Sequence, residues 1–168
     1  MRLLRKFAKE FHDDHGRYPT FWLDKVCIDQ SNPDDAIAVL PINIGACKSL
    51  LILMSPTYLS RLWCVWELLT LFTFCNKEIA LQRLHILPVC EEKELGGLLS
   101  QFDAFDWNNA HCFAPNEEFK MRQIMNNIGI ERLASSMKEI KSILESQQLK
   151  KKRTLASYFK NRIVPKDD

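Results

Sequence analysis

One carboxylate in this chain stands among aromatic residues in a segment with helical spacing. Glu67 follows Trp63 and Trp66, and apolar residues recur around it at intervals of three and four, which predicts an amphipathic helix. A carboxylate in that position can stabilise a developing positive charge or orient hydroxyl groups, while the indole rings exclude water. It can equally be a helix-surface charge that pairs with a cation such as Arg61 or Lys25.

Two aspartates, Asp24 and Asp29, bracket the loop that follows a predicted strand over residues 20–26. Ligands bind at the carboxyl ends of the strands in open α/β sheets, so both carboxylates are candidates for ligand contact. Asp29 could equally make a local turn hydrogen bond, and Asp24 could cap a neighbouring element. We take Asp24 and Trp63 as candidate substrate-binding residues that accompany Glu67.

The sequence contains no pattern typical of a metal site. Its six cysteines include no Cys-x-x-Cys pair and its four histidines are scattered, so we expect no metal. The cysteines lie in or beside apolar segments, where reduced thiols behave as small hydrophobes. Cys27 differs from the others because it follows the predicted strand into a loop, where functional groups collect.

The periodicities predict alternating helices and strands, which indicates an α/β layer fold with a single core. Pro41 should kink or break the helix that contains it, because proline removes a backbone donor. The expected elements are helices at 2–15 and 33–47, strands at 20–26 and 50–54, a helix from a Ser60 cap, a strand at 84–90, a short helix from residue 91, an edge strand at 102–107, a helix ending near Gly129 and a helix at 131–149.

Two phrases of the sequence resemble the second and third strands of TIR domains. Residues 21–30 contain a strand that ends in Trp-Leu-Asp, and their sequence resembles that of protist TIR-like domains. The same residues are also similar in sequence to heterokaryon-incompatibility domains. Residues 50–68 form a strand ending in Ser-Pro, then Tyr and Ser, then Trp-Cys, two variable residues and Glu-Leu. The resemblance covers residues 2–113 and implies a flavodoxin-like (TIR-like) parallel sheet with helices on both faces.

The first strand of a TIR domain has no counterpart in this chain, which starts at the helix that should follow it. That strand lies between the second and third in the flavodoxin-like order. Its omission would leave two strands about 10 Å apart with unpaired backbone groups. We therefore expect an N-terminally incomplete domain over 1–113, a C-terminal helical extension over 114–149 and a basic tail over 150–168. Alternatively, another segment fills the gap or the flanking strands pair directly.

The resemblance implies a signalling or defence module, as in innate immunity, that associates with itself or with other TIR-like domains. It also implies an alternative activity, cleavage of NAD+ as a substrate by catalytic Glu67, with no cofactor. Breaking the bond between nicotinamide and ribose builds positive charge on the sugar, which a carboxylate stabilises, as in glycoside hydrolysis. Active TIR domains also use the loop after the first strand, which argues against NAD+ cleavage by this chain alone.

The net charge of +2 implies no strong overall field, so we do not expect nucleic-acid binding. A basic run occurs only near the end, and it is an import signal, a contact for an acidic surface or a solvated helix end. The run consists of Lys150, Lys151, Lys152 and Arg153. No apolar run is long enough to span a membrane, so we expect a cytoplasmic protein, with nuclear entry as the alternative.

Overall fold

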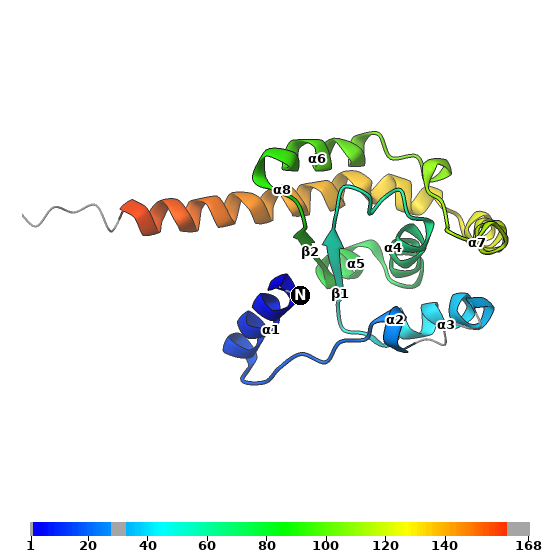
Figure 1. The fold of residues 1–168 in the computed structure, drawn as a ribbon, viewed down its shortest axis with the longest axis horizontal. Helices are drawn as coiled ribbons and strands as arrows, with labels where there is room; N and C mark the ends of the chain where they lie inside the picture. Colours follow the sequence, from blue (N-terminus) through cyan, green and yellow to red (C-terminus); the bar gives the residue numbers. More distant parts are fainter. Residues whose placement is uncertain (1, 28–32, 161–168) are drawn as a thin grey trace, which may run out of the picture.

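The structure is a computed structural model that describes residues 2–27 and 33–160, without the side chains of 2, 24–25, 33–36, 92 and 148–160. It is a mixed fold of helices around a small parallel sheet (Figure 1). In chain order the elements are α1 (Arg2–His15), α2 (Asp24–Cys27), α3 (Pro33–Ala46), β1 (Leu50–Met54), α4 (Leu62–Phe74), α5 (Lys77–Arg83), β2 (Leu84–Pro88), the 3-10 turn η1 (Glu92–Glu94), α6 (Leu95–Asp103), the 3-10 turn η2 (Trp107–Asn109), α7 (Pro115–Ile128) and α8 (Glu131–Lys160).

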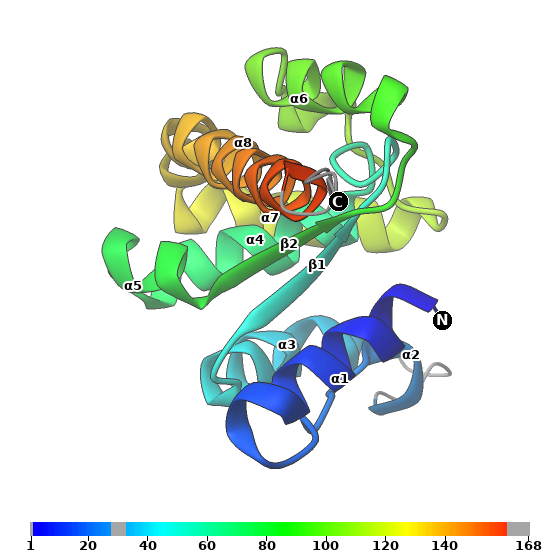
Figure 2. The ribbon, with the colours of Figure 1, turned by 90° about the vertical axis from the view of Figure 1, so that its left-hand side faces the viewer.

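The sheet formed by the described residues consists of β1 and β2, which run parallel with Leu50 opposite Leu84. Parallel strands require a crossover connection, and α4 and α5 provide it. Figure 2 shows α4 and α8 on one side of the strands and α1 on the other. Side chains alternate across the sheet: Ile52 and Met54 are fully buried, whereas Leu53 is 37% exposed. One face of the sheet is therefore sealed and the other only partly covered.

The core surrounds α4, an almost uncharged helix whose residues are buried on several sides. A helix that is apolar all round must lie inside the protein, and here three helices cover it. Their buried residues follow the helical rhythm of three and four. They are Ile37, Leu40 and Ile44 from α3, Met121 and Met125 from α7, and Leu133, Met137, Ile140 and Leu144 from α8.

Several predicted elements are confirmed. The helix at 2–15 and the strand at 50–54 have the expected bounds, and the strand expected at 84–90 forms over 84–88. The helix before Gly129 ends there because this glycine adopts a positive φ of 95°, the left-handed conformation that favours glycine. The last helix starts at Glu131 as expected but continues to Lys160, so its backbone includes the basic run.

The strand expected at 20–26 is wrong. Residues 18–23 are irregular, and α2 follows because the carbonyl oxygen of Leu23 accepts hydrogen bonds from the N–H groups of Val26 and Cys27. A strand is stable only when its backbone pairs with a neighbour, and among the described residues β1 pairs with β2 alone. Local turn bonds therefore replace the ladder that the sequence pattern suggested.

Other expectations need smaller corrections. The edge strand at 102–107 is absent, because α6 extends to Asp103 and Asp106 caps η2 by accepting from the Asn108 N–H. The helix α3 runs through Pro41 without a break. Ser60 is not a helix cap: Arg61 takes that position, and the Ser60 hydroxyl donates to the Thr57 carbonyl.

The crossover contains a helix, α5, that the sequence did not reveal. It begins after Asn76, whose side chain accepts a hydrogen bond from the Ile79 N–H. No helix in the described part of the chain is long and apolar enough to cross a membrane.

Candidate functional site

The helix α4 brings two of the predicted site residues together. Trp63 and Glu67 lie four positions apart, so their side chains are neighbours on one face of the helix. Both are half-buried, and Trp63 packs against the core. The backbone of Asp24 lies in α2, but its side chain falls outside the described residues. Asp29 also falls outside them.

Tyr58 lies beside the Glu67 carboxylate. The pKa of Tyr58 is raised well above its ordinary value, chiefly by burial and then by the negative charge of Glu67. A hydrogen bond to Glu67 contributes to the raised pKa of Tyr58 as well. Within the described part of the chain, the indole N–H groups of Trp63 and Trp66 are buried without a hydrogen-bond partner. Buried donors without partners are costly, at about 1–3 kcal/mol each. Glu67 is therefore sheltered: it is half-buried and lies beside a buried tyrosine.

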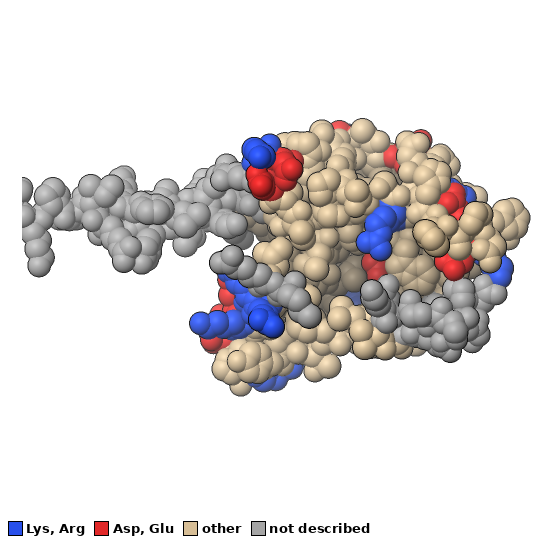
Figure 3. All heavy atoms as spheres, in the orientation of Figure 1, with Lys and Arg blue, Asp and Glu red and all other residues tan. Residues whose placement is uncertain are grey.

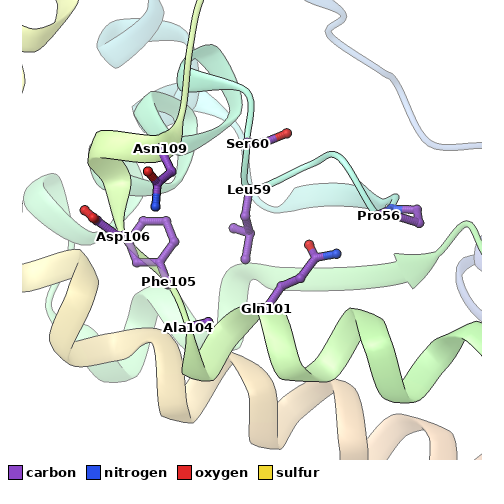
Figure 4. A pocket seen from close by; sticks show the side chains of 8 residues that line it. All are labelled: Pro56, Leu59, Ser60, Gln101, Ala104, Phe105, Asp106 and Asn109. Atoms are coloured by element: carbon purple, nitrogen blue, oxygen red, sulfur yellow. The ribbon is translucent and has the colours of Figure 1, made fainter.

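A second feature, an open cleft, lies beyond the carboxyl end of β1. It has a volume of about 210 Å³ and lies between the β1–α4 loop and the segment around the end of α6 (Figure 4). Neither Glu67 nor Trp63 contributes to it. The eight lining residues are Pro56, Leu59, Ser60, Gln101, Ala104, Phe105, Asp106 and Asn109.

The polar groups of this cleft are mostly amides and hydroxyls. Its one charged lining residue, Asp106, already accepts hydrogen bonds from the backbone and the side chain of Asn108. Ser60 donates to a backbone carbonyl. The lining includes no cation that would attract an anionic ligand and no nucleophile with an adjacent base. We therefore assign no catalytic role to the cleft.

The loop between η2 and α7 is held firmly beside the start of α4. The Glu118 carboxylate accepts hydrogen bonds from the Cys112 N–H at 2.9 Å and from Arg122 Nε at 2.9 Å, and its oxygen lies 3.1 Å from His111 Nδ1. The pKa of Glu118 falls to about 2, chiefly through the Cys112 N–H and then the Arg122 guanidinium. His111 also exchanges backbone hydrogen bonds with Ser60 and Leu62.

The side chains around Glu118 also hold this loop in place. The Arg122 guanidinium donates to the Ala110 carbonyl at 2.5 Å and lies 5.2 Å above the centre of the Trp107 ring. The pKa of Cys112 rises to about 11, because burial and the Glu118 charge disfavour the thiolate. Cys112 is therefore not a nucleophile at neutral pH.

Arg83 also links separate segments through its guanidinium group, a role that the sequence did not predict. Its Nη2 donates to the carbonyl oxygens of Ile44, at 2.6 Å, and Cys47, and its Nη1 lies 2.8 Å from Cys75 Sγ. The guanidinium thus satisfies carbonyls at the end of α3, which would otherwise have no intrahelical partner. A cation at the end of a helix is a sign that it can bind helix carbonyls. The carbonyls that Arg83 binds lie more than thirty residues earlier in the chain, so the sequence does not identify them.

All six cysteines are free, and the described residues contain no group of three histidine, cysteine or carboxylate side chains that could hold a metal ion. No protein-family model, curated protein or solved structure matches the chain. Function must therefore be argued from the residues themselves.

Proposed function

We propose that this chain is an intracellular signalling or defence module of the TIR type, which acts by associating with itself or with other TIR-like domains. The main support for this proposal is that apolar residues are exposed on the outer face of α3. Residues 36–47 contain no charge, and while Leu40 is fully buried, Ile42 is 71% exposed and Val39 39% exposed. A helix that is apolar all round belongs in an interior, so an exposed apolar face on it favours a binding partner.

The sheet is also compatible with the finer fold proposal. In it, β1 and β2 correspond to the third and fourth strands of a flavodoxin-like sheet, joined by the α4 and α5 crossover. The parallel pairing of Leu50 with Leu84 and the helices on both sides support this correspondence. The exposed Leu53 then marks the face that further elements would cover.

Sedimentation velocity over a range of protein concentrations tests the association. We expect the wild-type chain to form an oligomer of defined stoichiometry, and Ile42→Glu to raise its dissociation constant by at least about tenfold, because a charge would be buried without a partner. Ile79→Glu on α5 is the matched control, since Ile79 is also an exposed isoleucine. A wild-type chain that stays monomeric at every concentration, or equal losses in both variants, would count against α3 as the interface.

Cleavage of NAD+ by Glu67 is the second candidate, favoured by the sheltered carboxylate beside Tyr58. Wild-type chain and Glu67→Gln, both shown to be folded by circular dichroism, should be incubated with NAD+ while released nicotinamide is measured. Turnover that Glu67→Gln abolishes would establish the enzyme. No turnover from folded wild-type chain would leave the association module alone.

A further inference from the structure

The first helix, α1, is strongly amphipathic, yet it is only loosely attached to the molecule. No residue of α1 whose side chain is described is fully buried, and Leu3 is 38% exposed. Its ring contact with the sheet runs through Phe7, whose ring centre lies 6.1 Å from that of His85 on β2. The segment that follows α1 adds two ring contacts, Phe21 at 6.3 Å from Phe7 and Tyr18 at 4.4 Å from His12. The apolar face of α1 is therefore only half covered by the sheet.

The polar face of α1 separates its charges along the helix. The cations Arg5, Lys6 and Lys9 are exposed and come before the acidic residues Glu10, Asp13 and Asp14. Figure 3 shows Lys and Arg side chains over α1, at the lower left, with Asp and Glu side chains beside them. This order opposes the helix dipole, which favours acidic residues near the N-terminus and basic residues near the C-terminus. Among the described side chains of these groups, Lys6 and Glu10 form an ion pair at 3.7 Å, which is exposed and contributes little.

These cations therefore do not serve the stability of the helix, and residues that break a local rule without structural gain often mark a functional surface. Exposed cations opposite leucine and phenylalanine are typical of helices that lie in the plane of a membrane surface, and in α1 they occupy the N-terminal part of the polar face. The cations attract anionic head groups, and the apolar face enters the boundary between head groups and acyl chains.

We propose that α1 binds the surface of membranes that contain anionic lipids. The cations Arg5, Lys6 and Lys9 supply charge complementarity, and the half-covered apolar face, with its one ring contact to the sheet at Phe7, is able to leave the sheet. This peripheral binding is independent of the association proposed for α3. It would place the chain at a lipid surface, although no helix among the described residues could cross a membrane.

Co-sedimentation of the full chain with vesicles tests the proposal. One set contains phosphatidylcholine alone, and the other contains phosphatidylcholine mixed with phosphatidylserine. We expect binding to the mixed vesicles only, weakened by added salt because salt screens surface charges. Arg5→Glu combined with Lys9→Glu should weaken that binding by at least about 30-fold, the loss expected for two basic contacts with an anionic surface.

Two further charge reversals make the result specific. Lys48→Glu with Lys138→Glu changes the net charge from +2 to −2, as the α1 pair does, but at exposed sites outside α1. Lys150→Glu with Lys151→Glu tests the basic run of α8. Circular dichroism confirms that each variant is folded.

A loss confined to the α1 pair supports the proposal. If all three double variants lose vesicle binding equally, the loss results from the change in net charge. If only the Lys150 pair loses binding, the membrane-binding site lies in α8. Either result, or equal binding to both vesicle types, overturns the assignment to α1.

Discussion

The helices α1 and α4 have similar lengths but opposite relations to the core. Nine of the thirteen residues of α4 are buried, and its charged residue, Glu67, lies at the edge of the apolar surface. In α1, by contrast, every described side chain remains at least partly exposed, although its apolar stripe is clearer. A clean amphipathic stripe therefore predicts that a helix forms, but not that its apolar face is buried. Burial follows from how many neighbouring elements surround the helix.

This difference has consequences for stability. Because α3, α7 and α8 all pack on α4, disturbing α4 should affect the whole cooperative unit. Because no described side chain of α1 is fully buried, α1 should be able to detach while the rest of the molecule stays folded. Substitutions in the core, in the contacts around it and in α1 test this difference.

The largest effect is expected at Trp66, which is 1% exposed in the middle of α4. Trp66→Ala should lower the free energy of unfolding by about 3–5 kcal/mol, because it removes a large buried side chain and leaves a cavity. Chemical denaturation followed by circular dichroism measures the change. Phe74→Ala in the same helix is the control, since Phe74 is 61% exposed and should cost less than about 1 kcal/mol. Similar losses in both variants would show that α4 is not the centre of the core.

The next effect concerns Glu118, which fixes the loop beside the start of α4. The pKa of Glu118 is about 2 in the folded chain, below its ordinary value of 4.5, so its contribution to stability is present above pH 4.5 and is lost as the pH falls toward 2. Glu118→Gln should cost about 2 kcal/mol at pH 7 and flatten the pH dependence in that window. Thermal unfolding measured from pH 7 to pH 3 checks both. Parallel pH profiles for wild-type and variant would contradict this role.

The elements confirmed from the sequence are those whose signal is local. Pro33 and Gly129 mark helix ends through their own backbone preferences, and residues 50–54 form a continuous apolar run. The strand expected at 20–26 failed because strand formation requires a partner that a local pattern cannot supply. The missed helix α5 is short, and its main signal is the Asn76 cap.

For the candidate site too, only the contacts within one helix could be predicted from the sequence. Trp63 and Glu67 meet because helical spacing alone makes them neighbours. The proximity of Tyr58 to Glu67 and the contact of Arg83 with the end of α3 depend on tertiary packing, which no single segment encodes. The cations of α1 do not form a continuous run in the sequence, because leucine, phenylalanine and alanine separate its lysines and arginines.

A smaller effect is expected at Arg83, which ties the core helices together at the end of α3. Arg83→Met keeps the length of the side chain but removes its donors, leaving the carbonyls of Ile44 and Cys47 with fewer partners. We expect a loss of about 1–2 kcal/mol in the free energy of unfolding, because hydrogen bonds to charged groups are stronger than average. Arg17→Met, at an exposed site, is the control. An unchanged Arg83→Met variant would mean that water satisfies those carbonyls equally well.

The smallest global effect is expected at Phe7, and it tests the contrast most directly. Phe7→Ala removes the ring contacts with His85 and Phe21, but the ring is only partly buried, so the free energy of global unfolding should fall by about 1 kcal/mol or less. Hydrogen exchange should reveal more: amides of α1 should exchange faster than those of α4 in the wild-type chain, and faster still in the variant. The core amides should remain almost unaffected, because α1 contributes none of the buried residues. If α1 and α4 instead exchanged at the same rate, both helices would belong to one cooperative unit, and α1 could not leave the sheet to bind another surface.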